Sequence, residues 1–218
     1  LYSFTAVALV ILNYGMETGF FRYANKESDP ERVYTTTLLT VGSTSLLFII
    51  LLSLLLHPVA TALLLPDNSV YVWLLGVTVA VDAFSNIPFA YLRFRNKAFR
   101  FAGIKLLNVF VNIALNLFFL LLCPKIWQSA PEAIAWFYEA PGGEAFGIGW
   151  IFVANLLSTL IVLLCLLPQL TGRRYAFSGT LLKRMLGYSW PLLILGVAGI
   201  LSQNMGQILI PYIFQGHE

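Results

Sequence analysis

The sequence predicts an all-α membrane protein with six transmembrane helices. Of its 218 residues, 59% are apolar and 11% are charged, whereas a soluble domain has roughly 45–50% apolar and about 25% charged residues. The apolar residues gather in six segments, each long enough to cross a hydrocarbon core of about 30 Å at about 1.5 Å per residue. The strands of a membrane barrel would alternate in polarity, and these segments do not.

The predicted spans follow one another with short connections. They cover residues 1–21, 34–56, 70–92, 101–122, 147–167 and 188–214. Runs such as Leu46 to Leu56 are apolar on every side of a helix, which is typical of helices in lipid. Because the chain begins at Leu1 inside an apolar segment, without a basic region before it, we expect a fragment of a longer membrane protein and no signal peptide.

The basic residues predict how the spans are oriented. Twelve of the 13 Lys and Arg residues lie in or beside the first, third and fifth connections, and only Lys125 lies in the other two. Connections on the cytoplasmic side of a membrane are enriched in Lys and Arg. We therefore expect Leu1 and Glu218 on the outer side.

The first span carries charges near its inner end. Glu17 lies about one turn inside the membrane, and Arg22 marks the boundary. Gly15 and Gly19, one turn apart, permit a second helix to approach closely. The two charged residues either pair with each other or with charges in the loops, or they line the inner mouth of a cavity.

The third span carries an acidic residue near its middle. Thr78, Asp82 and Asn86 are spaced four apart and so share one face of the helix. Asp82 lies about 15 Å from the inner end at about 1.5 Å per residue. An ionised carboxylate at this depth has to face water or a partner, or else be protonated. The alternative is a neutral or hydrogen-bonded aspartate that ties the third span to a neighbour.

The fourth span carries a polar stripe. A single asparagine is explained by hydrogen bonding between helices, but three in register with a lysine favour a water-filled groove. The fifth and sixth spans also have one polar face each, so we expect a central cavity. The stripe consists of Lys105, Asn108, Asn112 and Asn116, and the other two faces carry Asn155, Ser158 and Thr159, and Gln203, Asn204 and Gln207.

The sequence contains no motif for catalysis, for a metal or for nucleic acid. It lacks a nucleophile elbow, a phosphate-binding loop and a zinc-protease motif, and its two histidines are isolated. Cys123 and Cys165 are predicted on opposite faces of the membrane, which excludes a disulfide between them. We expect no enzyme, cofactor, metal or nucleic-acid partner, and an integral membrane enzyme that uses Asp82 or Glu17 is the alternative.

Four segments together resemble a family of transporters. They are Gly15 to Arg22, the helix from Asp82 to Arg93 with Ile87-Pro88-Phe89-Ala90, the start of the polar stripe at Lys105-Leu106-Leu107-Asn108, and Leu186-Gly187-Tyr188-Ser189-Trp190-Pro191-Leu192. This pattern is similar to bacterial polysaccharide biosynthesis exporters, the lipopolysaccharide and O-antigen flippases of the multidrug/oligosaccharidyl-lipid/polysaccharide (MATE-like) superfamily. The resemblance covers essentially the whole chain.

The resemblance implies a fold and a cargo. Members have two six-helix lobes with alternating access, and this chain would hold helices two to seven. Residues 1–167 would form most of the first lobe, residues 168–187 the cytoplasmic linker and residues 188–218 the first helix of the second lobe. The implied cargo is an undecaprenyl-diphosphate-linked oligosaccharide, flipped across the bacterial inner membrane beside glycosyltransferases or a polymerase of the same pathway and in contact with membrane lipids.

Other functions remain open at this point. Arg22 and Lys105 either contact the diphosphate or only extend to the membrane surface and fix the topology. A cation-coupled multidrug exporter of the same superfamily would use Asp82 or Glu17 for a proton or a sodium ion, and a membrane scaffold would transport nothing. The four candidate charges sum to zero, so they do not separate an anionic lipid headgroup from a cationic drug.

Overall fold

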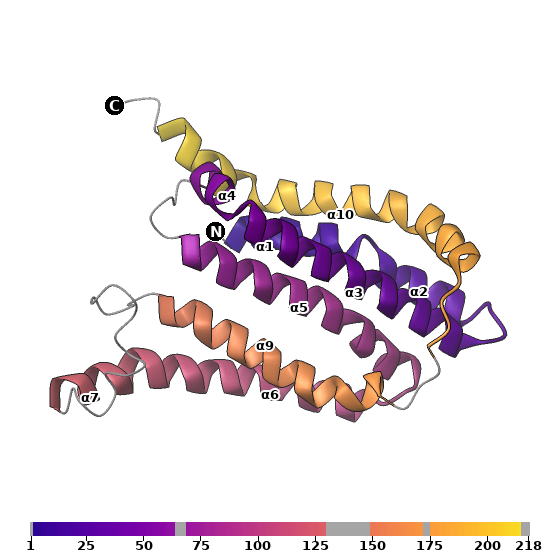
Figure 1. Ribbon diagram of the computed structural model, residues 1–218, viewed down its shortest axis with the longest axis horizontal. Coiled ribbons are helices and arrows are strands. Elements are labelled where there is room, and N and C mark those ends of the chain that lie inside the picture. Colours follow the sequence, from indigo (N-terminus) through magenta and orange to yellow (C-terminus); the bar gives the residue numbers. More distant parts are fainter. Residues whose placement is uncertain (1, 64–68, 130–148, 172–174, 215–218) are drawn as a thin grey trace.

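The computed structural model describes residues 2–63, 69–129, 149–171 and 175–214, and all regular elements in these ranges are helices (Figure 1). This confirms the predicted all-α class. Four of the described helical stretches are long and apolar enough to cross a membrane: Pro30–Leu54, Ser69–Phe94, Ala98–Ile126 and Gly149–Leu170. The described helices are α1 (Tyr2–Asn13), α2 (Met16–Ala24), α3 (Pro30–Leu54), α4 (Leu56–Ala62), α5 (Ser69–Phe94), α6 (Ala98–Leu117), the π-helical turn η2 (Phe118–Leu122), α7 (Cys123–Ser129), α9 (Gly149–Leu170) and α10 (Gly179–Phe214).

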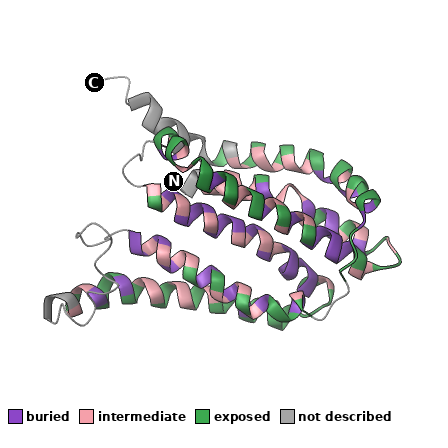
Figure 2. Cartoon of the chain, in the orientation of Figure 1, coloured by how far each residue is buried: buried purple, intermediate pink, exposed green. Residues whose placement is uncertain are grey.

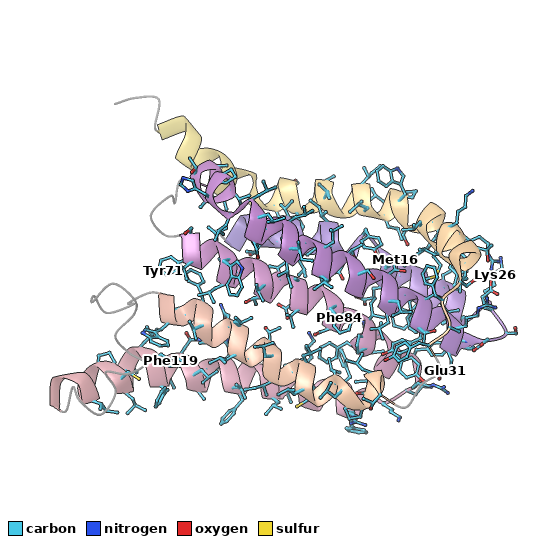
Figure 3. The ribbon with its side chains drawn as sticks, viewed as in Figure 1. Met16, Lys26, Glu31, Tyr71, Phe84 and Phe119 are labelled. Atoms are coloured by element: carbon cyan, nitrogen blue, oxygen red, sulfur yellow. The ribbon has the colours of Figure 1, made fainter. Side chains whose placement is uncertain are left out.

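The long helices run antiparallel, so the basic residues gather at one end of the bundle. Figure 1 shows the α2–α3, α5–α6 and α9–α10 connections together at this end, while α4 and α7 lie at the opposite end. In Figure 3, Lys26 and Glu31 lie at the first end and Tyr71 and Phe119 at the other. We call the first the basic end; its described basic residues are Arg22, Lys26, Arg32, Arg93, Arg95, Lys97, Arg100, Lys183 and Arg184. Arg173, Arg174 and His217 lie outside the described residues.

The first predicted span is interrupted, which corrects the expectation of one helix over residues 1–21. α1 ends at Asn13 and α2 begins at Met16. Between them Tyr14 and Gly15 have φ angles of 29° and 70°. Glycine adopts this left-handed conformation without the steric cost that a Cβ atom brings. The apolar composition of the segment concealed the break.

The remaining helix boundaries differ from the predicted ones by up to nine residues. α3 begins at Pro30 because the Asp29 side chain accepts hydrogen bonds from the backbone N–H groups of Glu31 and Arg32, at 3.1 and 3.2 Å. α10 begins at Gly179, before the predicted start of the last span at residue 188. Residues 147 and 148 of the predicted fifth span lie outside the described ranges.

The core lies along α5, which is the helix with the most extensive buried surface in Figure 2. α3 and α9 pack on α5, and α6 packs on α9. The largest cluster of buried side chains is near the basic end and includes Phe20, Tyr34, Ile87 and Met185. By contrast, Leu54 and Phe110 are exposed to 76% and 71%, on the outer faces of α3 and α6. Contact of such apolar faces with lipid is favourable, whereas their exposure to water costs free energy.

A candidate polar cavity between four helices

A polar cavity of about 300 Å³ lies between α1, α5, α6 and α9. This volume is large enough for small polar molecules, because one water molecule occupies about 30 Å³ in the liquid. Three of the predicted site residues, Asp82, Asn108 and Asn112, line it. The other described residues of the lining are Thr5, Ala6, Leu9, Leu75, Thr78, Val79, Asn155, Ser158 and Thr159.

Asp82 has a polar and a charged neighbour. The Thr159 hydroxyl of α9 and the Lys105 ammonium group of α6 both lie close enough to its carboxylate to interact with it. Thr78, one turn earlier on α5, donates its hydroxyl to the Leu74 carbonyl at 2.8 Å. Because a hydroxyl oxygen can still accept a hydrogen bond when its proton is donated, Thr78 adds an acceptor to the lining.

A chain of amides joins α6 to α9 on the cavity wall. The Asn112 side-chain N–H₂ donates to Asn155 Oδ1 at 2.6 Å and to Ser158 Oγ at 3.2 Å. Asn116 donates back to the Asn112 backbone carbonyl at 2.8 Å and to its Oδ1 at 3.0 Å. Asn112 therefore both lines the cavity and links two helices, so the two functions expected for it coexist. Asn116 supports Asn112 and does not reach the cavity itself.

Asn108 presents an unused acceptor. Its Oδ1 atom is buried and has no hydrogen-bond partner among the described residues, and the residue lines the cavity. A buried polar atom without a partner costs about 1–3 kcal/mol. A water molecule or a polar ligand in the cavity would remove this cost, so the lining is complementary to a hydrogen-bond donor.

Asn86 and Lys105 lie outside the cavity. The Asn86 side chain donates to Asn13 Oδ1 at 3.3 Å and so ties α5 to the last residue of α1. The Lys105 ammonium group lies over the Phe89 ring, 4.3 Å from its centre. A cation above an aromatic face is stabilised by the ring quadrupole. Of the four charged candidates, only Asp82 belongs to the lining.

Glu17 and Arg22 lie at the basic end and not at the cavity. Glu17 forms an ion pair with Arg93 at the end of α5. The Arg22 guanidinium lies over the Tyr188 ring of α10, 4.1 Å from its centre. Both charges thus have partners in other helices: Glu17 pairs with an arginine of α5 and not with Arg22, and Arg22 contacts an aromatic ring and not a charge in a loop. The described lining of the cavity then carries a single formal charge, that of Asp82.

Ion pairs also bind the connections at the basic end to one another. Arg95, just after α5, contacts Glu31 at the start of α3, and Tyr91 donates its hydroxyl to Glu31 Oε1 at 2.6 Å. Hydrogen bonds to Tyr91 and to Glu31 raise the pKa of Arg95 above its ordinary value. Arg184 at the start of α10 pairs with Glu27 at 3.0 Å. These contacts fix the ends of the helices in water, where each exposed pair contributes about 0–1 kcal/mol.

A second cavity, of about 380 Å³, is apolar and adjoins the polar one. It lies between α1, α3, α4 and α5, and Phe48, Leu52 and Val59 are among its lining residues. Thr5, Leu75 and Val79 line both cavities, so they form a shared wall. The α1 residues of the two linings, Thr5, Ala6, Ala8 and Leu9, carried no sequence signal, because they form no polar stripe at helical spacing.

No group of three or more His, Cys, Asp and Glu side chains in the described residues is arranged to hold a metal ion. Both cysteines are free; Cys123 is buried and Cys165 is half-buried. The chemistry of the polar cavity is therefore that of hydrogen bonds and one carboxylate.

Comparison with protein-family models, with curated proteins and with solved structures gives no match for this chain. In the residues that the structure describes, the chain is a helical membrane protein, and four of its helical stretches are long and apolar enough to span a membrane. Within that bundle, residues from α1, α5, α6 and α9 enclose one polar cavity.

Proposed function

We propose that this chain is part of a flippase that moves an undecaprenyl-diphosphate-linked oligosaccharide across the bacterial inner membrane for surface polysaccharide synthesis. The observation that carries the proposal is the polar cavity around Asp82, inside a bundle whose outer faces are apolar. Polar groups at membrane depth are costly, and they commonly mark the path of a polar cargo. The segments Gly15 to Arg22 and Leu186 to Leu192, which resemble the exporters, support this choice of cargo.

The proposal includes an arrangement in the membrane. α1 and α2 together form an interrupted first span, α10 forms the last, and the four long apolar helical stretches lie between them. Residues 1–167 belong to the first lobe of a MATE-like transporter, residues 168–187 to the cytoplasmic linker and residues 188–218 to the second lobe. The basic end then faces the cytoplasm, and both ends of the chain face outward.

The cavity is better suited to sugars than to a diphosphate. Sugar hydroxyls donate and accept hydrogen bonds, and Asp82, Asn108 and Asn112 offer both kinds of partner. The diphosphate is anionic and would be repelled by Asp82, the one charge of the described lining. In this proposal the diphosphate stays outside the cavity lining, with Arg22 at the basic end and Lys105 on α6 as its donors, since arginine and lysine both bind phosphate. The lipid tail remains in the bilayer.

A cation-coupled multidrug exporter is the second candidate. The observation that favours it is the negative charge of Asp82, because an acidic lining attracts cations. Such a protein would bind a proton, a sodium ion or a cationic drug where the first proposal has a sugar.

The first proposal predicts that changes in the cavity block polysaccharide export. Asp82→Asn and Asn112→Leu, introduced into the gene that encodes this chain, should lower surface polysaccharide at least tenfold at unchanged protein level. Lipid-linked oligosaccharide should accumulate in the inner leaflet, because it is made there and no longer leaves. Asn86→Leu is the matched control. It removes an asparagine of α5, the helix of Asp82, that lies outside the cavity. It should leave export within twofold of the parent.

The same cells separate the two candidates. Normal surface polysaccharide in both cavity variants, with a loss of resistance to cationic dyes, would contradict the flippase and support the drug exporter. Equal loss of export in all three variants would mean that membrane asparagines act only in helix packing.

A further inference from the structure

Several hydrogen-bond donors in the wall of the polar cavity are already used by the protein. Both N–H bonds of the Asn112 amide go to α9, to Asn155 Oδ1 and to Ser158 Oγ. The Ser158 hydroxyl in turn donates to the Asn155 backbone carbonyl at 2.9 Å. The Thr78 hydroxyl donates to the Leu74 carbonyl. These N–H and O–H groups are directed to protein oxygens, so they are not available to a ligand.

Three oxygen-bearing side chains of the lining can still accept hydrogen bonds. Asn108 Oδ1 is buried and has no partner among the described residues. The Thr78 oxygen keeps acceptor capacity after its proton is donated. A carboxylate has about four lone-pair positions, and Thr159 interacts with that of Asp82. Thr78 and Asp82 are one turn apart on α5, and Asn108 comes from α6, so the three side chains border one cavity.

This set of acceptors matches a protonated primary amine. An ammonium group carries three N–H donors and one positive charge, as a lysine side chain does. The three acceptor groups offer the same number of partners, and Asp82 supplies the opposite charge. Hydrogen bonds between ionised groups are about twice as strong as those between neutral groups. A neutral hydroxyl would bring one donor and no charge, and would therefore leave two acceptors unpaired.

The ammonium group of Lys105 does not occupy this place. Lys105 interacts with Asp82 electrostatically, but its ammonium group lies over the Phe89 ring and the residue is not part of the lining. The described lining contains no Lys or Arg. Because the Asp82 side chain itself borders the cavity, a second cation can reach it from inside.

The rest of the cavity has room for a ring. An ammonium group, which is similar in size to a water molecule of about 30 Å³, fills a small part of the volume of about 300 Å³. Ala6 and Leu9 of α1 and Leu75 and Val79 of α5 give the lining an apolar part. A sugar ring presents C–H groups to such side chains and hydroxyls to polar ones. Small-molecule sites commonly combine apolar walls with a few placed polar groups.

We propose that the polar cavity recognises a sugar unit with a free, protonated amino group, which is bound by Asp82, Asn108 and Thr78. This inference rests on the proposed function in taking a lipid-linked oligosaccharide as the cargo, and it adds the class of sugar that the cargo contains. An N-acetylated amino sugar keeps one N–H but loses the charge, and a neutral sugar lacks both. The cavity discriminates against these two classes.

The test measures how well small probes protect a thiol in the cavity. In the full protein with Cys123→Ser and Cys165→Ser, Ala6→Cys places a thiol in the lining, away from the three acceptors. At mildly acidic pH, glucosamine should slow labelling by a small neutral thiol reagent at least threefold in vesicles. At the same concentration, glucose and N-acetylglucosamine should slow it less than twofold. Tetramethylammonium, which has the charge but no N–H group, should also have less than a twofold effect.

Two variants and a matched control assign the effect to the acceptors. Asp82→Asn should remove the protection by glucosamine. Glu17→Gln removes a carboxylate of equal charge that lies outside the cavity and pairs with Arg93, and it should leave the protection within twofold of the parent. Asn108→Leu should reduce the protection and raise the thermal midpoint of the empty protein, because it removes the unpaired oxygen. An asparagine that only holds helices together would lower the midpoint when replaced.

The outcomes separate this inference from the proposed function. Equal protection by glucosamine and glucose, or unchanged protection in Asp82→Asn, would overturn the ammonium site. Equal protection by tetramethylammonium would also overturn it, since charge alone would then be recognised, as expected of a drug exporter. If these results came with a loss of polysaccharide export in the cavity variants, the flippase would still be supported. If glucosamine protects selectively but the cavity variants export normally, the flippase is wrong and the ammonium site stands.

Discussion

The spacing of polar residues predicts part of the cavity lining correctly, but not all of it. Asp82, Asn108 and Asn112 were predicted to share a cavity, and all three line it. Asn86 does not, although it lies on the same predicted face. Four residues advance a helix by about 40° beyond a full turn, so the step from Thr78 to Asn86 turns the face by about 80°. Asn86 thereby points to Asn13 of α1 instead.

The charged candidates show what spacing cannot reveal. Glu17 pairs with Arg93 and Arg22 lies over Tyr188. In both cases the partner comes from a helix far along the chain, and only the packing of the helices brings the two together. A long side chain can also reach partners in several directions, and the spacing of residues along a helix does not determine which partner it contacts.

At the residue scale we predict that Arg22 and Lys105 bind the diphosphate in addition to contacting their aromatic rings. Arg22→Gln and Lys105→Gln should reduce polysaccharide export at normal protein levels, because the donors for phosphate oxygens are lost. Lys105→Arg should keep function, and Arg22→Lys should lose it if the contact is bidentate. Measurement of surface polysaccharide in all four strains checks this. Normal export in every strain would leave the two residues with a role in topology alone.

At the scale of elements, the apolar segments predicted the existence of the long helices but not their ends. α3 begins where Asp29 caps it and Pro30 occupies its first position, a signal present in the sequence. The break between α1 and α2 depends on a backbone conformation that α10 helps to stabilise through Ser189. That contact is tertiary, so no local pattern in the first span predicts it.

The cap of α3 gives a prediction at this scale. Asp29→Ala removes the acceptor for the N–H groups of Glu31 and Arg32 and should lower the free energy of unfolding by about 1 kcal/mol. Asp29→Asn keeps an oxygen in the same place and should cost much less. Denaturant unfolding in detergent micelles, followed by circular dichroism, compares the two. A loss of equal size in both variants would show that the charge of Asp29, and not the cap, stabilises α3.

At the scale of the whole molecule, the alternation of basic connections predicted the gathering of positive charge at one end of the bundle. The antiparallel helices carry the described basic residues other than Lys105 and Lys125 to that end, as expected (Figure 1). Which side of the membrane this end faces stays a prediction. It follows from the enrichment of Lys and Arg in cytoplasmic connections.

The orientation is tested with single cysteines in a protein that lacks Cys123 and Cys165. Cysteines at Ser28 and at Phe99, which is 97% exposed, should be protected from an impermeant thiol reagent in spheroplasts, because both lie at the basic end. A cysteine at Thr61, an exposed residue of α4 at the opposite end, should react. Reaction at Ser28 with protection at Thr61 would invert the orientation.

Water access shows whether the polar cavity lies inside the membrane-spanning bundle. Single cysteines at Asp82 and at Asn112, which line the cavity, are compared with a cysteine at Leu120, on the apolar side of η2. In membranes, we expect a small polar thiol reagent to label the first two positions at least tenfold faster than Leu120. Equally slow labelling at all three positions would mean that these polar residues only hold helices together, and it would contradict the cavity and the function proposed for it.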